Sequence, residues 1–237
     1  MYVDGFVIPV NAARREEFVA HANRMDPHFL ARGARRVVEA WGADISPGKL
    51  TDFRRAVQAN ESEAVAFAWI EWPDKATRDA AFQALEADAA MMAEPMPFDG
   101  KRMIFGGFEA VVSHGAPRPG DYVQGFVIPV PEGRKSDYFK LADEAWPLFA
   151  GYGATAVVEA WGDDVPDGKQ TDFYRAVNAE PGEKIVFSYM TWPSRDVCDA
   201  AAEKMRDDPA MQMPEDMPFD GERMIWGGFE PVVELGA

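Results

Sequence analysis

Hydrophobic and polar residues follow two different spacings in the first 112 residues, and the change between them predicts a mixed α and β structure. Residues 2–10 (YVDGFVIPV) alternate with period two, which is typical of a β-strand. Between residues 12 and 32 the apolar side chains recur every three or four positions, which predicts a helix with Asn11 as its cap. The other predicted elements are strands at 35–42, 51–59, 63–72 and 102–112 and a second helix from Asp74 to about Met92.

This succession is β-α-β-β-α-β with an additional hairpin arm, which is the ferredoxin-like arrangement, and the chain contains it twice. Residues 2–10, 37–42, 48–57 and 96–109 recur with few changes at 122–130, 157–162, 168–177 and 217–230. Each copy has the size of a small domain, and the stretch rich in proline and glycine between them is typical of a linker. We therefore expect ferredoxin-like domains at 1–113 and 121–237, with 114–120 as the linker.

The apolar residues of each expected sheet predict how the two copies pack. A single antiparallel sheet with both helices on one face leaves its other face uncovered. The uncovered face is expected to carry Phe6, Ile8, Trp41, Phe53 and Phe67, which is more apolar surface than water tolerates. Two such sheets would cover each other. The predicted fold class is therefore α+β, with two ferredoxin-like domains packed sheet to sheet as a pseudo-dimeric α+β barrel.

Composition and charge exclude several classes of protein. The 237 residues carry a formal net charge of −16, and this field repels polyanions, so we expect no nucleic-acid partner. No window approaches the roughly 18 consecutive apolar residues that a membrane span needs. The first residues lack the pattern of a secretory signal, which indicates a cytoplasmic protein with no membrane partner. The single cysteine, Cys198, excludes a zinc or iron–sulfur site built on cysteines.

The repeated motifs resemble a known family. YVDGFVIPV, VVEAWGADISPGK, TDFRRAVQA and MPFDGKRMIFGGFE look like the motifs of the YbaA-like family of uncharacterised bacterial proteins, and the resemblance covers each copy from end to end. It implies the dimeric α+β barrel superfamily, in which single-domain members pair as homodimers, so the two fused copies would form a covalent dimer. The wider superfamily includes cofactor-independent monooxygenases and haem-degrading enzymes. The resemblance therefore allows a small-molecule site without assigning an activity.

The strongest candidate site comes from a glutamate and an arginine in the expected hairpin. Period-two alternation places Glu39 and Trp41 on one face of their strand and Arg55 on one face of the next. A hairpin folded about Pro47 would put Glu39 opposite Arg55, on the face turned toward the other copy. This pair could orient a ligand in an apolar pocket, or it could be a structural ion pair. The candidate ligand-binding residues are Glu39, Trp41, Arg55, Glu159, Trp161 and Arg175.

Other reactive residues give weaker signals. His21 and His28 lie on one helix face about 10 Å apart along its axis, too far to share one metal ion. Leucines replace both in the second copy, which favours packing histidines over catalytic ones. Cys198 lies between two aspartates that disfavour its thiolate, and we interpret it as an incidental surface residue.

The segments around the last strand of each copy also suggest structural roles. The GGFE motif lies inside a predicted strand, where paired glycines favour a bulge or close backbone packing over nucleotide binding. Asp99 and Arg102 are expected to fix the turn before that strand, as are Asp220 and Arg223. Methionines next to the turn either line a pocket mouth or fill gaps beneath a loop. They are Met91, Met92, Met96 and Met103, and Met205, Met211, Met213 and Met217.

These observations support two hypotheses of function. In the first, the protein binds or transforms a small molecule in the barrel interior, without a bound metal or other cofactor. In the second, it is a non-catalytic structural or interaction protein with a filled core between its sheets. A cavity of at least about 300 Å³ beside the candidate residues would favour the first hypothesis. Whether the protein is an enzyme stays open at this point, as does oligomerisation beyond the intramolecular pseudo-dimer.

Overall fold

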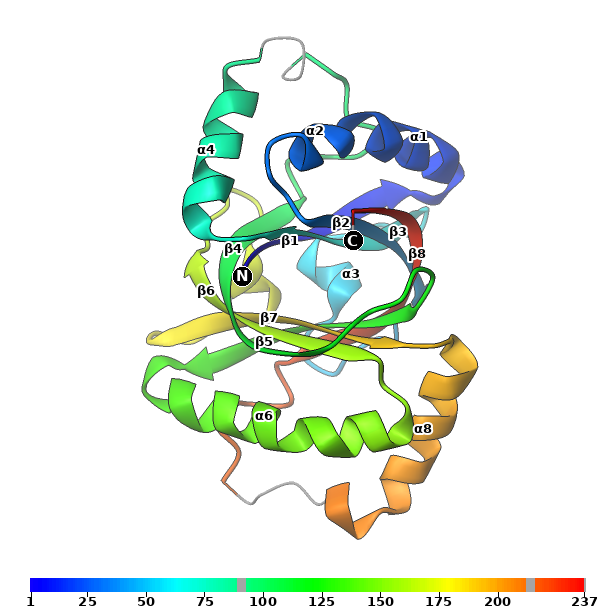
Figure 1. The fold of residues 1–237 in the computed structure, drawn as a ribbon, viewed down its shortest axis with the longest axis vertical. Coiled ribbons are helices and arrows are strands. Elements are labelled where there is room, and N and C mark those ends of the chain that lie inside the picture. Colours follow the sequence, from blue (N-terminus) through cyan, green and yellow to red (C-terminus); the bar gives the residue numbers. More distant parts are fainter. Residues whose placement is uncertain (89–92, 212–215, 237) are drawn as a thin grey trace.

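The computed structural model describes residues 1–88, 93–211 and 216–236 (Figure 1). The first repeat contains β1 (Tyr2–Asn11), η1 (Ala12–Arg14), α1 (Arg15–Met25), α2 (Pro27–Leu30), β2 (Arg36–Asp44), α3 (Phe53–Ala56), β3 (Glu63–Trp72), α4 (Lys75–Glu86) and β4 (Ile104–Gly115). The second contains β5 (Tyr122–Pro131), η2 (Glu132–Arg134), α6 (Lys135–Tyr152), β6 (Ala156–Asp164), α7 (Phe173–Ala176), β7 (Glu183–Trp192), α8 (Arg195–Asp207), η3 (Pro209–Met211) and β8 (Ile225–Gly236). The predicted ferredoxin-like order is confirmed in both repeats.

The strands of both repeats join in one closed antiparallel barrel, in the order β1-β3-β2-β8-β5-β7-β6-β4. Each repeat contributes four consecutive strands to this order. The repeats meet at two seams, where β2 pairs with β8 and β4 pairs with β6. The barrel has no free edge, because each seam gives the outer strand of one repeat a partner in the other. The predicted pseudo-dimeric α+β barrel is therefore confirmed.

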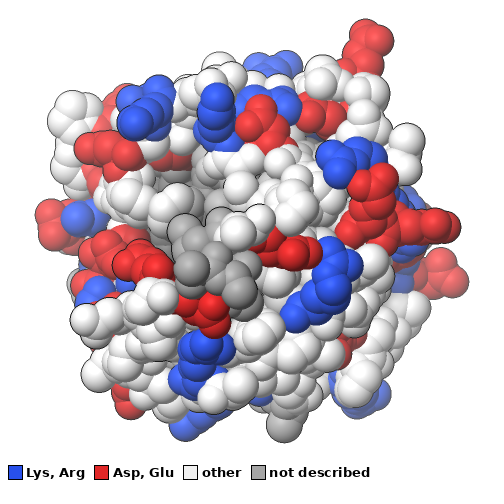
Figure 2. All heavy atoms as spheres, turned by 90° about the horizontal axis from the view of Figure 1, so that it is seen from above, with Lys and Arg blue, Asp and Glu red and all other residues white. Residues whose placement is uncertain are grey.

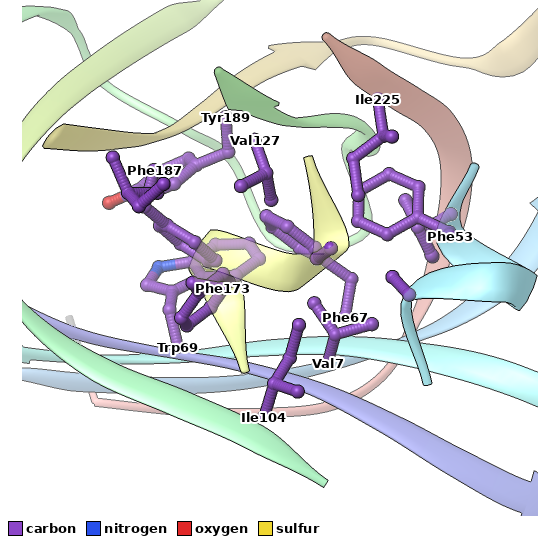
Figure 3. Close-up of a cluster of buried hydrophobic side chains, with 14 of the residues drawn as sticks. Val7, Phe53, Phe67, Trp69, Ile104, Val127, Phe173, Phe187, Tyr189 and Ile225 are labelled. Atoms are coloured by element: carbon purple, nitrogen blue, oxygen red, sulfur yellow. The ribbon is translucent and has the colours of Figure 1, made fainter. Parts of the chain in front are cut away.

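Large apolar side chains fill the barrel interior. Phe67 and Phe187 occupy corresponding positions in the two repeats and stack face to face at the centre, with ring centroids 4.6 Å apart and planes 1° from parallel. Trp69 and Tyr189 stack beside them at 4.2 Å. Figure 3 shows these side chains reaching toward one another from opposite halves of the barrel. The interior is therefore a packed core, and the expectation of a ligand site there is wrong.

Two short helices complete this core where the sequence predicted a strand. Residues 53–56 form α3, and Asp52 caps this helix by accepting a hydrogen bond from the Arg55 backbone N–H. The second repeat forms α7 in the same way, with Asp172 as its cap. Phe53 and Phe173 are fully buried in the core cluster, and α3 lies between the two halves of the barrel (Figure 1). The predicted strand at 51–59 is wrong because these apolar residues pack from a helical turn.

The longer helices cover the outside of the barrel. Those of the first repeat lie on one side of the molecule and those of the second on the opposite side (Figure 1). The first predicted helix is divided at Pro27, whose ring fits the first turn of a new helix. The second ends at Glu86, and Met92 lies outside the described residues. Phe6, Ile8 and Trp41 face these helices, so their assignment to the face shared by the two sheets is wrong.

Two glycines on β1 and β5 make room for the stacked phenylalanine rings in the barrel. A Cβ on Gly5 would lie 2.6 Å from the Phe187 ring, and one on Gly125 would lie 2.9 Å from the Phe67 ring. Only glycine therefore leaves room for the stacked pair. The register of β4 on β6 shifts between Gly107 and Phe108, which agrees with the bulge expected at the GGFE motif.

The outer surface carries charges of both signs. Figure 2 shows acidic and basic side chains interspersed over the end of the molecule formed by α1, α2 and α4. Arg102 donates to Asp99, with Nε and Oδ2 2.8 Å apart, and it also pairs with Glu63. These contacts agree with the expectation that Asp99 and Arg102 fix the turn before the last strand. Arg223 and Asp220 form the same contact in the second repeat. None of the described helices is long and apolar enough to cross a membrane.

Candidate functional site: two pockets beneath the helices

Each repeat holds an apolar pocket between the outer face of its half-barrel and the helix that covers it. The pocket of the first repeat encloses about 280 Å³ beneath α1. The pocket of the second encloses about 380 Å³ beneath α6. Corresponding residues line both, namely Phe6 and Phe126, Ile8 and Ile128, Phe98 and Phe219, and Met103 and Met224. We call them the repeat-1 pocket and the repeat-2 pocket.

A glutamate from the second strand of each repeat lines each pocket. The VVEAWG motif alternates along β2, so Val38 and Ala40 point into the barrel core while Val37 and Glu39 point toward α1. The same alternation places Glu159 beneath α6. A carboxyl group in such an apolar setting is stable mainly when it is protonated or hydrogen-bonded.

The repeat-2 pocket supplies hydrogen-bond donors to its glutamate. The Tyr138 hydroxyl, on α6, donates to Glu159 with Oη and Oε2 2.8 Å apart. Burial raises the pKa of Glu159 to about 7, while the hydroxyls of Tyr138 and Ser188 act in the opposite direction. Near neutral pH this carboxyl therefore exists in both protonation states, so it can donate or accept a hydrogen bond.

The repeat-1 pocket holds a second carboxyl and a histidine instead. Asp26, at the end of α1, is 4% exposed and lines this pocket together with Glu39 and His21. Burial raises the pKa of Asp26 and raises the pKa of Glu39 well above its ordinary range, and the Asp26 charge adds to the rise at Glu39. Burial lowers the pKa of His21, so its ring is neutral near pH 7.

Glu94 and Arg24 lie beside this group. The Arg24 guanidinium binds the Glu94 carboxylate, with Nη2 and Oε1 2.7 Å apart. The Nδ1 atom of His21 is 4.0 Å from the same carboxylate oxygen. Arg24, whose charge acts on His21, is therefore already paired with Glu94.

The predicted pair of Glu39 with Arg55 is wrong. Arg55 lies on α3, where its side chain is about half exposed and bonds to its own cap, Asp52, and to the Gly48 carbonyl. Arg175 does the same on α7 with Asp172 and Gly168. The pairing fails because residues 53–56 form a helical turn, so the two arginines bond to the preceding loops and do not line the repeat-1 or the repeat-2 pocket.

The candidate residues Trp41 and Trp161 are not among the residues that line the two pockets. Trp41 lies on the same face of β2 as Glu39 and packs against Phe18, with ring centroids 5.9 Å apart. Trp161 packs against Phe139 in the same way, with ring centroids 5.9 Å apart. Both therefore contact the first turns of the helices that cover the pockets.

Other candidate residues have mixed outcomes. Cys198 is 4% exposed, so the surface position expected for it is wrong, and burial raises the pKa of its thiol to about 12. Met96 and Met103 line the repeat-1 pocket, and Met211 lines the other, while Met91, Met92 and Met213 lie outside the described residues. Among the described residues no group of three or more histidine, cysteine, aspartate or glutamate side chains is placed to hold a metal ion.

Sequence reasoning missed Asp26 and Tyr138. Asp26 directly precedes Pro27, and the helix break at this proline places its carboxyl in the pocket. Tyr138 corresponds to Phe18 in the first repeat. A comparison of the two repeats could have identified both, because polar residues there replace apolar ones on the inner side of a helix.

Comparison of the sequence with known protein families shows which family the chain belongs to. Residues 1–100 and 121–221 each match the family described as "Protein of unknown function (DUF1428)". The chain belongs to this family. The uncharacterised protein YbaA of Escherichia coli K12 is 53% identical over 114 residues, which is 48% of this chain and 97% of that protein. YbaA of Shigella flexneri matches to the same extent. A tandem duplication of a YbaA-like unit is therefore shown.

Solved structures share the fold at low sequence identity. A protein described as anthrone oxidase-like superposes with a TM-score of 0.57 at 13% identity, covering 99% of this chain and 92% of the other. A protein of Lactobacillus acidophilus NCFM, described as a proposed monooxygenase, has a TM-score of 0.55 at 10% identity, with 99% and 96% covered. At these identities the likeness shows the fold alone.

Proposed function

We propose that the protein binds a small, mostly apolar molecule with one polar group in each of the two pockets. The observation that carries this proposal is the repetition of an apolar cavity with a buried glutamate, Glu39 or Glu159, at corresponding positions of the two repeats. Cavities of roughly 300 Å³ with apolar walls and few polar groups are typical of small-molecule sites. The glutamate would fix the orientation of the ligand through its polar group.

The protonation of the glutamate defines the chemistry that the pockets support. A carboxyl with a pKa near the working pH can hydrogen-bond a hydroxyl or carbonyl group and can exchange a proton with it. Glu159, with its pKa of about 7, fits this role.

Equilibrium dialysis with 1-naphthylmethanol, a neutral two-ring alcohol, tests the proposal. Ala22→Phe and Ala142→Phe each place a ring in one pocket, because Ala22 lines the first and Ala142 the second. We expect the wild type to bind two equivalents, each single variant one, and the double variant none. Ala20→Phe on the exposed side of α1 is the matched control and should bind two. Equal binding by the wild type and the double variant would contradict the proposal.

A second candidate function rests on the packed barrel interior. The hypothesis of a structural or interaction protein expected a filled core between the sheets, and the stacked Phe67 and Phe187 rings lie there. That core is compatible with either function, because the pockets lie outside it. An absence of binding by a panel of one-ring and two-ring neutral, anionic and cationic probes would favour the structural role.

A further inference from the structure

Three buried side-chain nitrogen or oxygen atoms of the described residues have no hydrogen-bond partner, and all three belong to residues that line the repeat-1 pocket. They are His21 Nδ1, Asp26 Oδ2 and Glu39 Oε2. A buried polar atom without a partner is unfavourable, because it has lost its hydrogen bond to water, and three of them in one pocket leave that contribution uncompensated. The arrangement indicates that a bound molecule supplies the missing partners.

The repeat-2 pocket shows that these atoms are not required by the fold. Leu141 replaces His21 and Trp146 replaces Asp26 at the corresponding positions. The remaining glutamate, Glu159, receives its hydrogen bond from Tyr138, where the first repeat has Phe18. The repeat-2 pocket thus supplies a hydrogen bond to its carboxyl, whereas the repeat-1 pocket holds an additional carboxyl and a histidine and has no tyrosine at that position.

The charges around the repeat-1 pocket indicate which ligand fits. Asp26 and Glu39 are close enough for the Asp26 charge to act on Glu39, and no basic side chain among the described residues offsets either carboxyl. Arg24, whose charge acts on His21, is paired with Glu94. The pocket therefore offers two carboxyls with no positive partner, inside a protein whose net charge of −16 attracts cations.

We propose that the repeat-1 pocket binds an organic amine in its protonated form, with the ammonium group at His21, Asp26 and Glu39 and an apolar body among the aromatic rings. An ammonium group has three N–H donors, and the pocket presents three unpartnered atoms that can accept them. Phe18 and Phe29 line the same cavity and can contact the cation through their ring faces. This inference rests on the proposed function and names its ligand class for one of the two pockets.

The proposal has a consequence for pH. The ammonium group needs ionised carboxyls, and burial raises the pKa of both Asp26 and Glu39 in the empty pocket. Binding must therefore release protons, and affinity should increase as pH rises from about 5 to about 8. The other titratable groups at the pocket do not reverse this increase of affinity with pH. Glu94 is paired with Arg24, and a protonated His21 at low pH would repel the amine.

A matched pair of probes tests the proposal in the Ala142→Phe variant, in which only the repeat-1 pocket stays open. 1-Naphthylmethylamine and 1-naphthylmethanol differ only in the amine and hydroxyl groups. By titration calorimetry at pH 7.5 we expect the amine to bind at least tenfold more tightly than the alcohol, with proton release detected in buffers of different ionisation enthalpy. Asp26→Asn should remove this preference by weakening the binding of the amine at least tenfold. Glu86→Gln, on the exposed side of α4, should leave the preference intact.

The outcomes separate this inference from the proposed function. Binding of the alcohol without a preference for the amine would overturn the amine site and leave the proposed function standing. Binding of neither probe would overturn both for this pocket. A preference that survives Asp26→Asn and Glu39→Gln would also overturn the proposal, because the amine would then lie elsewhere. Far-ultraviolet circular dichroism spectra and gel-filtration volumes that match those of the Ala142→Phe parent show that these variants are folded.

Discussion

At the scale of single residues, the protein retains buried carboxyl groups where an apolar residue would stabilise the fold. Glu159 illustrates the balance, because its hydrogen bond from Tyr138 offsets only part of the cost of burial, and its pKa is raised to about 7. Glu39 lacks even that donor. The sequence identified both glutamates as candidates from strand alternation alone. It could not identify their surroundings, because these depend on which helix covers the strand.

A charge-neutral substitution measures the cost of burying Glu159. An unperturbed glutamate titrates near 4.5, so between that pH and about 7 the folded state keeps a proton that the unfolded state has lost. The free energy of unfolding therefore decreases as pH rises through this interval. We expect Glu159→Gln, which keeps an acceptor for Tyr138, to be more stable than the wild type by about 3 kcal/mol at pH 8 and nearly equal to it at pH 4.

Urea unfolding at both pH values provides the measurement. Glu203→Gln on the exposed side of α8 is the control and should change stability little at either pH. If the stability difference between Glu159→Gln and the wild type is the same at pH 4 and pH 8, burial does not raise the pKa of Glu159.

At the scale of elements, the strands and the longer helices follow from the sequence, whereas α3 and α7 do not. Long periodic segments such as 63–72 have a strong pattern, and β3 spans the same residues. Residues 53–56 are too few to show a helical period, and their burial depends on contact between the repeats. The local signal for the helix was Asp52, a residue type favoured at N-caps.

Two threonines fasten these short helices across the barrel. The Thr51 hydroxyl donates to the Ala176 carbonyl at 2.5 Å, and the Thr171 hydroxyl donates to the Ala56 carbonyl at 2.6 Å. Thr51→Val or Thr171→Val leaves a buried carbonyl without its partner, so we expect each to lower the free energy of unfolding by about 1–3 kcal/mol. Denaturant unfolding checks this, with Ser136→Ala on the surface as control. Losses below about 0.5 kcal/mol for both variants would show that the helices are held by apolar packing alone.

At the scale of the whole molecule, the duplication closes the barrel within one chain. The repeat was evident in the sequence, and it predicted that the two copies form one barrel, which the strand order confirms. The packing at the centre of the barrel could not be predicted from the sequence, because the fit of Phe67 and Phe187 depends on the glycines of the opposite repeat.

We expect Gly5→Ala to lower the free energy of unfolding by about 1–3 kcal/mol, because the added methyl group overpacks against Phe187, and thermal unfolding measures this loss. Gly133→Ala, with open space at its Cβ, should be neutral, and equal melting temperatures would contradict this packing.

The proposed division into repeats at 1–113 and 121–237 has its own test. A protease site inserted between Pro117 and Pro119 would cut the chain in the linker, while the seams β2–β8 and β4–β6 still hold the halves together. We expect the cut protein to elute in gel filtration with the intact 26.3 kDa chain. Separation into two independent halves under native conditions would show that the barrel depends on the covalent link.

The most direct test of the central claim, that two buried glutamates serve the helix-covered pockets, is a carbon-13 NMR titration of the glutamate carboxyl groups. Glu39→Gln and Glu159→Gln assign the two resonances by their disappearance. We expect both carboxyls to titrate well above the ordinary glutamate value, with Glu159 at about 7, and both resonances to shift when 1-naphthylmethanol is added. Ordinary titration near 4.5 for both residues, or resonances that do not respond to the probe, would contradict the account.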